Sequence, residues 1–170
     1  MIVKSEFNAV RAVVAILLAL IFVLISLLWG NPVHAGDLPD PQLTPGEATD
    51  TPIDVLCHSK TNLTRDVPES LKQQVFAEYG MQQEHRPDCT GPHHACFQID
   101  HLDHRKNGGA DKIRNLWPQA YDGTPWNAHV KDRLEQRLIE LVCVDKTLTQ
   151  QQAFACITSN WIACYQETFK

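Results

Sequence analysis

An apolar stretch near the N-terminus places the strongest constraint on how this chain folds, because it decides the compartment. Residues 12–29 are apolar apart from one serine, and they follow a short start that carries Lys4 and Arg11. A positive start, an apolar core and small side chains just before residue 36 are typical of a secretory signal peptide. The stretch is also near the lower length limit for a membrane-spanning helix. We therefore predict that residues 1–35 are a cleaved signal or an uncleaved membrane anchor, and that the rest is exported to the periplasm or secreted.

Export makes the cysteines candidates for disulfide bonds. A bond between Cys89 and Cys96 would close a short polar loop, and Cys143 is expected to pair with Cys156 or Cys164. The last two lie eight residues apart, about 12 Å along a helix, so they cannot pair with each other in a continuous helix. The six disulfide candidates are Cys57, Cys89, Cys96, Cys143, Cys156 and Cys164.

The net charge excludes a generally basic nucleic-acid coat protein. The formal net charge is −5 at pH 7, and the chain without residues 1–35 carries 13 basic and 19 acidic residues. An acidic protein repels phosphate backbones over most of its surface. Residues 101–137 differ, because they hold seven basic and five acidic side chains. Any phosphate-binding role is expected in this segment.

The exported part divides into a linker and one domain. Residues 36–52 contain four prolines and no apolar periodicity, which predicts a solvated linker. From residue 53 the composition is globular, and the length suits one small domain. We predict an α+β fold over residues 53–170, with helices at residues 68–80 and 126–143 and a last helix after Thr149, whose capping-box partner is Gln152.

The expected strands are short and bracket the polar residues of interest. Residues 97–99 lead directly into Asp100 and His101, and residues 113–117 form a second strand closed by Pro118. A carboxylate at a strand end can hold a hard cation, and the neighbouring imidazole can take a proton from water.

The connection between the strands carries further polar residues and two glycines. Gly108 and Gly109 allow a tight return where a phosphate backbone can approach. The amide of Asn115 can pin the loop, and a polar residue at the start of the next helix would complete a metal site. Asn127 and His129 are both candidates for that position.

This order of residues resembles the HNH (ββα-metal, or His-Me finger) nuclease family. The resemblance covers Asp-His at 100–101, Gly-Gly at 108–109, Asn-Leu at 115–116, and Asn127 and Lys131 at a helix start. With the surrounding segments it extends over most of the exported domain and is similar to an exported bacterial HNH-like group. It implies a small ββα-metal core flanked by additional helices and stapled by disulfides.

The resemblance also implies roles for individual residues. His101 would be the general base against a phosphodiester bond, and Asn115 the structural middle residue of the motif. Asp100 would bind one divalent cation, most plausibly Mg²⁺ with Mn²⁺ or Zn²⁺ as alternatives, and either Asn127 or His129 would be the second ligand.

The substrate implied by the resemblance is DNA or RNA, with no organic cofactor. Lys131 would contact a substrate phosphate, and residues 12–29 would attach the protein to a membrane if they remain uncleaved.

Two other functions are compatible with the same residues. One is a non-catalytic module of the same fold, which keeps Asp100 and His101 as a metal or nucleic-acid site. The other is a small structural zinc protein, because zinc is bound by Cys and His. Its ligands would be Cys89, His93, His94 and Cys96.

Overall fold

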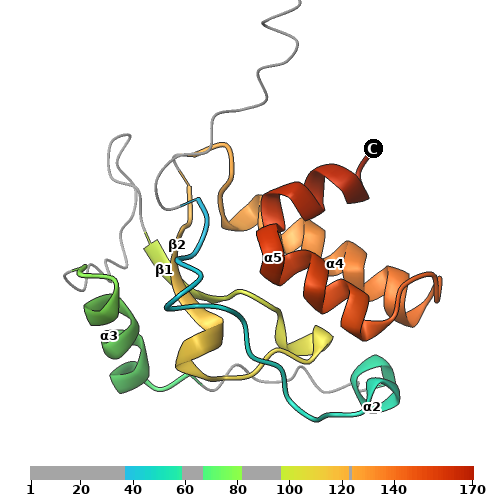
Figure 1. The fold of residues 1–170 in the computed structure, drawn as a ribbon, viewed down its shortest axis with the longest axis horizontal. Coiled ribbons are helices and arrows are strands. Elements are labelled where there is room, and N and C mark those ends of the chain that lie inside the picture. The colour runs from blue at the N-terminus through green and yellow to red at the C-terminus, as the bar shows by residue number, and fades with distance from the viewer. Residues whose placement is uncertain (1–36, 59–66, 82–96, 123) are drawn as a thin grey trace, which may run out of the picture. The chain divides into compact units, whose positions relative to one another are not determined.

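One small sheet lies between helices in the part of the chain that the structure describes. This computed structural model describes residues 37–58, 67–81, 97–122 and 124–170, so the predicted signal or anchor lies outside it. The predicted α+β class is confirmed (Figure 1). In chain order the elements are α2 (Ile53–His58), α3 (Glu69–Glu78), β1 (Phe97–His101), the 3-10 helices η1 (Arg105–Asn107) and η2 (Ile113–Asn115), β2 (Leu116–Ala120), α4 (Ala128–Cys143) and α5 (Gln150–Thr168). No helix in these ranges is long and apolar enough to cross a membrane.

The two strands pair antiparallel, in a register that sets His101 opposite Leu116. β1 is longer than predicted, so that both Asp100 and His101 belong to it. The predicted position of the second strand is wrong, because residues 113–115 form η2 and β2 continues through Pro118. Each strand of a two-stranded sheet has an unpaired edge, where a residue without an N–H group is tolerated.

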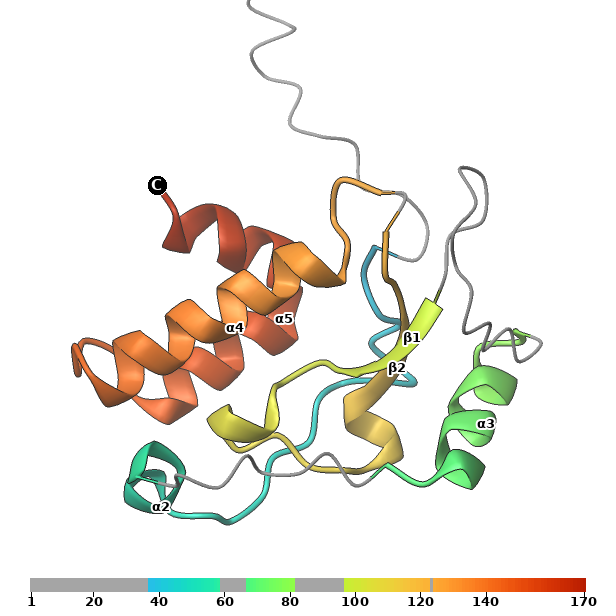
Figure 2. The same ribbon diagram turned by 180° about the vertical axis from the view of Figure 1, so that it is seen from behind.

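The two faces of the sheet enter two separate hydrophobic clusters, because successive side chains on a strand point to opposite faces. Ile99 and Leu116 pack with Val75 and Phe76 of α3. Trp117, the next residue on β2, belongs to the cluster between α4 and α5. Figure 2 shows α3 on one side of the sheet and the α4–α5 pair on the other. The sheet is therefore held from both faces.

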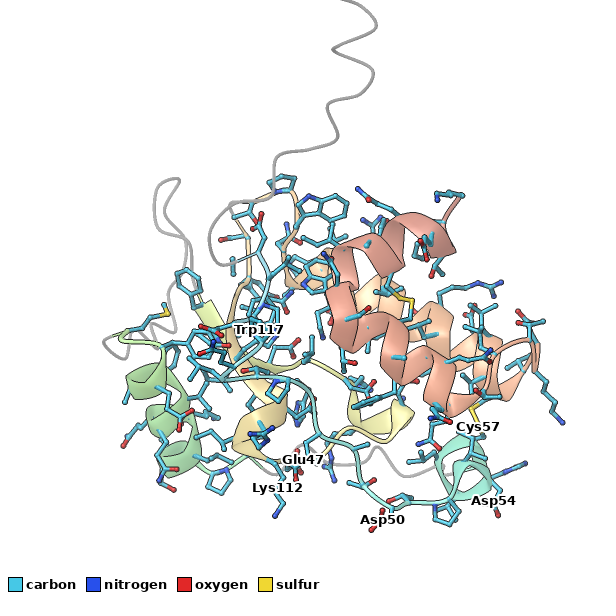
Figure 3. All side chains as sticks on the ribbon, viewed as in Figure 1. Glu47, Asp50, Asp54, Cys57, Lys112 and Trp117 are labelled. Carbon is cyan, nitrogen blue, oxygen red and sulfur yellow. A yellow bond between two sulfur atoms is a disulfide. The ribbon has the colours of Figure 1, made fainter. Side chains whose placement is uncertain are left out.

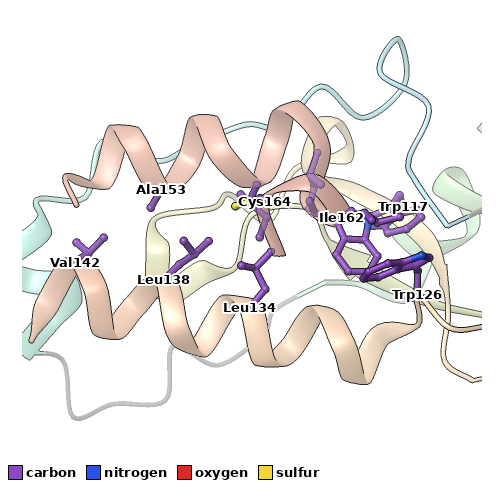
Figure 4. Packing of buried hydrophobic residues seen from close by; sticks show 11 residues of the cluster. Trp117, Trp126, Leu134, Leu138, Val142, Ala153, Ile162 and Cys164 are labelled. Carbon is purple, nitrogen blue, oxygen red and sulfur yellow. The ribbon is translucent and has the colours of Figure 1, made fainter. Parts of the chain in front are cut away.

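α4 and α5 lie side by side and enclose the larger cluster. The helix predicted over residues 126–143 is confirmed as α4, and its Leu134, Leu138 and Val142 point toward α5 in Figure 4. The capping box predicted for the last helix is also confirmed. The Thr149 hydroxyl accepts the N–H of Gln152 at 3.2 Å, and the Gln152 side chain accepts the N–H of Thr149 at 2.8 Å.

α5 contains a break, so it is not a continuous helix. Asn160 has φ −166° and ψ 98°, outside the helical region, and its side-chain oxygen accepts the N–H of Ala163 at 3.0 Å. This is N-cap geometry, so a second helical segment begins there. The bend brings Cys156 and Cys164 into a disulfide with Cα atoms 5.3 Å apart. The pair was excluded only for a continuous helix, and the break at Asn160 removes that condition.

Another disulfide links Cys57 of α2 to Cys143 at the end of α4 (Figure 3). The prediction that Cys143 pairs with a cysteine of the last helix is therefore wrong. The bond joins residues that are 86 positions apart in the sequence, and it ties α2 to the helical core. The two disulfides of the described chain indicate an oxidising, extracytoplasmic environment.

The Pro-rich segment before α2 packs against the sheet, so the prediction of a solvated linker over residues 36–52 is wrong for its described part. The Thr44 hydroxyl donates to the carbonyl oxygen of Leu116 at 2.8 Å. The carbonyl oxygen of Glu47 accepts the N–H of Ala110 at 2.8 Å. This packing is made largely through backbone groups, so it leaves no apolar periodicity in the sequence. The segment supports the loop between β1 and β2, which carries the site described next.

Candidate active site at the end of β1

β1 ends in Asp100 and His101, whose side chains leave the strand on opposite sides. The Asp100 carboxylate faces α4, where its Oδ2 lies 2.9 Å from Nζ of Lys131. The His101 ring faces the β1–β2 loop, where its Nε2 lies 2.7 Å from Oδ1 of Asp111. Asp100 and His101 therefore belong to two different polar clusters. We call them the lysine centre, formed by Asp100, Lys131 and Glu135, and the histidine centre, formed by His101, Asp111 and Arg105.

The β1–β2 loop is closed by the side chain of Asn115, the last residue of η2. Its Nδ2 donates to the carbonyl oxygens of Asp103 at 2.9 Å and Ala110 at 3.0 Å, and its Oδ1 accepts the N–H of Asp103 at 3.0 Å. The side chain is fully buried, so these bonds are shielded from water. One amide therefore holds both limbs of the loop. The prediction that Asn115 pins the loop is confirmed, although the residue precedes β2 instead of lying on it.

Gly108 and Gly109 allow the β1–β2 loop to close on itself. A side chain at Gly109 would overlap the backbone carbonyl of Asp103. Gly108 has φ +104°, in the left-handed region that favours glycine. The predicted tight return is confirmed, and the chain that approaches it is the protein's own, since Ala48 forms a bridge with Gly109.

The histidine centre is partly open to solvent. The second oxygen of Asp111 pairs with Nε of Arg105 at 3.3 Å. The His101 side chain is 4% exposed, whereas those of Asp111 and Arg105 are 20% and 24% exposed. No sequence pattern marks either partner, because a loop acid ten residues beyond a histidine has no diagnostic spacing. Only the closure by Asn115 brings them together.

The lysine centre is enclosed. The ammonium of Lys131 contacts the carboxylates of Asp100 and Glu135 and the carbonyl oxygen of His101, and its side chain has no exposed surface. Burial opposes the charge of Lys131, but the two carboxylates outweigh it and raise the pKa of the ammonium. Burial raises the pKa of Glu135, partly offset by the charge of Lys131. The geometry does not support the predicted contact of Lys131 with a substrate phosphate, because its ammonium is surrounded by protein groups.

The predicted metal ligands have other partners. The Asn127 side chain caps α4 by accepting the N–H of Val130 at 3.3 Å. His129 packs edge-on against Tyr121, with ring centroids 4.5 Å apart, and Asp100 has an ammonium beside it. Among the residues that the structure describes, no group of three or more His, Cys, Asp or Glu side chains could hold a metal ion. Lys131 therefore lies beside Asp100, where the resemblance implies a divalent cation, and the alternative zinc ligands between residues 89 and 96 lie outside the described chain.

The two residues that follow Leu102 have strongly shifted pKa values. Burial raises the pKa of Asp103 to about 7, against the opposing effect of the positive charge of Lys131. Burial lowers the pKa of His104 to about 4, and Lys131 adds to that effect. Between these two values both side chains are uncharged. In that pH range the loop therefore carries two neutral groups beside the charged centres, the buried Asp103 and the half-buried His104.

Charge distinguishes the surfaces around the site. An open pocket of about 440 Å³ adjoins the lysine centre, and three carboxylates contribute to its wall, which disfavours a phosphodiester there. Of the exposed cations on the β1–β2 loop, Lys106 also lines this pocket, whereas Lys112 and Arg114 lie outside its lining. The pocket is lined by His104, Lys106, Asp132, Glu135, Gln136, Ile139 and Glu140.

Any assignment of function depends on this geometry. Searches against protein-family models, curated proteins and solved structures found no match for the chain. The histidine centre combines a buried imidazole, a carboxylate on one ring nitrogen and nearby exposed cations. Such a group can accept a proton from water beside an anionic substrate.

Proposed function

We propose that this protein is an exported nuclease that hydrolyses phosphodiester bonds in DNA or RNA, with His101 as the general base. The observation that carries the proposal is the histidine centre, in which a strand-end imidazole contacts the Asp111 carboxylate within a loop closed by Asn115. The loop lies between two antiparallel strands, and helix α4 follows them. This is the order of elements expected from the resemblance to HNH nucleases. Histidine is the side chain most often used as a general base.

The exposed cations of the β1–β2 loop are proposed to bind the phosphate backbone in place of Lys131. Lys106, Lys112 and Arg114 are exposed, and along the sequence they lie within ten residues of the histidine centre. Ammonium and guanidinium groups bind phosphates by releasing condensed counterions. With only a few such contacts on an acidic protein, binding should be modest and should weaken with added salt.

Export is proposed from two independent features. Residues 12–29 have the apolar composition of a signal core or anchor. The disulfides Cys57–Cys143 and Cys156–Cys164 fit a protein that folds outside the cytoplasm.

The test is cleavage of supercoiled plasmid and of RNA by the exported, oxidised protein, in Mg²⁺, Mn²⁺, Zn²⁺ or chelator. His101→Ala should reduce the cleavage rate by about 10²- to 10⁴-fold, the usual contribution of a general base. His58→Ala is the matched control, because His58 is an exposed histidine of α2. Equal cleavage by wild type and His101→Ala in every condition would refute the proposal.

A non-catalytic nucleic-acid-binding module of the same fold is the second candidate. It is favoured by the lysine centre, where an ammonium instead of a metal site accompanies Asp100. In that case the protein would bind DNA or RNA in a salt-dependent manner, and no metal ion would produce cleavage. The plasmid assay combined with a binding assay separates the two candidates.

A further inference from the structure

The carboxylate of Asp111 occupies the position from which a side chain can control the catalytic histidine. We propose that Asp111 is the positioning residue of His101. Its carboxylate holds the ring proton on Nε2 and so presents Nδ1 as the proton acceptor, while Arg105 fixes the carboxylate. This inference rests on the proposed role of His101 as the general base. It assigns the orientation of that base to a residue outside the sequence motif.

The first support is the chemistry of the contact. Nε2 of His101 and Oδ1 of Asp111 are 2.7 Å apart, the separation of a charge-assisted hydrogen bond. An ionised carboxylate only accepts hydrogen bonds, so the proton between the two atoms belongs to the ring nitrogen. A neutral imidazole carries one proton, and its lone pair then lies on Nδ1. The carboxylate therefore selects one of the two tautomers.

The second support is that both ends of the contact are fixed. The His101 ring is buried at the end of β1, and the other oxygen of Asp111 pairs with Nε of Arg105 at 3.3 Å. Asn115 binds the carbonyl oxygen of Ala110, which directly precedes Asp111. The carboxylate is thus held through its backbone, through the guanidinium and through the imidazole. A group fixed in this way can hold a catalytic ring in one orientation.

Two substitutions of Asp111 separate orientation from charge. Asp111→Ala removes the acceptor, and Asp111→Asn keeps a neutral acceptor of nearly the same shape. We expect Asp111→Ala to lower kcat roughly 10- to 100-fold, the range found when a group that orients a metal-ligating histidine is removed. KM should change less than about twofold, because Asp111 does not bind the substrate in this proposal. Asp111→Asn should recover part of the lost kcat.

A spectroscopic readout tests the contact without any need for activity. In protein labelled with ¹⁵N-histidine, the His101 ring is identified by the resonance that disappears in His101→Gln. The wild type should show a slowly exchanging proton on Nε2, which Asp111→Ala loses and Asp111→Asn retains. The matched control is Asp50→Ala, at an exposed aspartate outside the β1–β2 loop (Figure 3), and it should leave both the resonance and kcat unchanged. Circular dichroism confirms that each variant is folded.

The outcomes distinguish this inference from the proposed function. Loss of the Nε2 proton together with a fall in kcat in Asp111→Ala supports the inference. A protected proton on Nδ1, or an Nε2 proton that persists in Asp111→Ala, overturns it even if His101→Ala abolishes cleavage. A wild-type kcat in Asp111→Ala also overturns it. Cleavage that does not depend on His101 overturns the proposed function, and with it any catalytic role for Asp111.

Discussion

The lysine centre and the histidine centre begin at adjacent residues of β1 yet differ in how they meet solvent. In the first, the ammonium of Lys131 is fully buried between two carboxylates. In the second, the His101 ring is buried, but its partners Asp111 and Arg105 reach the surface. One strand end therefore supplies a closed charge cluster on one side and an accessible one on the other.

This difference separates a structural role from a chemical one. A buried ion pair contributes little net stability, but the loss of one partner leaves an uncompensated charge in a medium of low dielectric. A partly exposed group tolerates substitution better and can exchange protons with water. We therefore expect changes at the lysine centre to affect folding and changes at the histidine centre to affect activity.

The largest effect is expected for Lys131→Met, which removes the ammonium and leaves Asp100 and Glu135 without their shared cation. The free energy of unfolding should fall by about 3–5 kcal/mol, the usual result of breaking a buried ion pair. Urea denaturation followed by circular dichroism measures it. By contrast, Asp111→Ala in the histidine centre should cost about 1.5–3 kcal/mol, the net value of a hydrogen bond to a charged group.

A double variant checks the cause of that destabilisation. In Lys131→Met combined with Glu135→Gln, one of the two stranded carboxylates is gone. Part of the lost stability should return, because the two changes act on the same contact and are not additive. Equal losses of stability in Lys131→Met and Asp111→Ala would contradict the contrast between the centres.

The sequence contains a signal for the burial of Lys131. The prediction that Lys131 contacts a substrate phosphate did not take it into account. Lys131 lies three residues before Leu134 and seven before Leu138, so it shares their buried helix face. Glu135, four residues further, supplies the partner that a buried lysine needs. Helical periodicity therefore predicts that Lys131 is buried beside Glu135.

Other parts of the site depend on contacts that no local pattern records. Asp111 meets His101 only because Asn115 closes the loop. The Cys156–Cys164 disulfide requires the break at Asn160. The helices, by contrast, follow from apolar spacing and from the capping residue Thr149, which act within one or two turns. Local signals thus predicted α3, α4, α5 and the closure of the loop by Asn115, and they missed α2 and the long-range partners.

A smaller effect is expected from pH, because Asp103 and His104 respond to it in opposite directions. The pKa of Asp103 is 3.8 in its ordinary state and about 7 in the fold. The unfolded chain loses that proton first, so this group makes stability fall as the pH rises from about 4 to 7. The pKa of His104 is 6.5 ordinarily and about 4 in the fold. The unfolded chain gains that proton first, so this group makes stability rise with pH from about 4 to 6.5.

Single variants should reveal these opposed slopes. Asp103→Asn leaves the contribution of His104, so its free energy of unfolding should rise with pH more steeply than that of the wild type. His104→Gln leaves the contribution of Asp103, and the slope should shift the other way. Urea denaturation at several pH values between about 4 and 7 measures both. Identical slopes in the two variants would show that burial does not hold these two side chains neutral.

The smallest effect is expected for Lys112→Gln, the exposed counterpart of the enclosed Lys131. Lys112 lies in the loop of the histidine centre and points to solvent (Figure 3), so its removal should leave the stability within about 0.5 kcal/mol of wild type. Binding to nucleic acid should weaken, and the slope of log K against log salt should decrease by about one unit, as for one lost phosphate contact. Lys170→Gln, at an exposed lysine outside the loop, is the matched control and should keep the wild-type slope. Equal slopes for the two variants would mean that phosphate is bound elsewhere, and the contrast between an enclosed and a substrate-facing lysine would then fail.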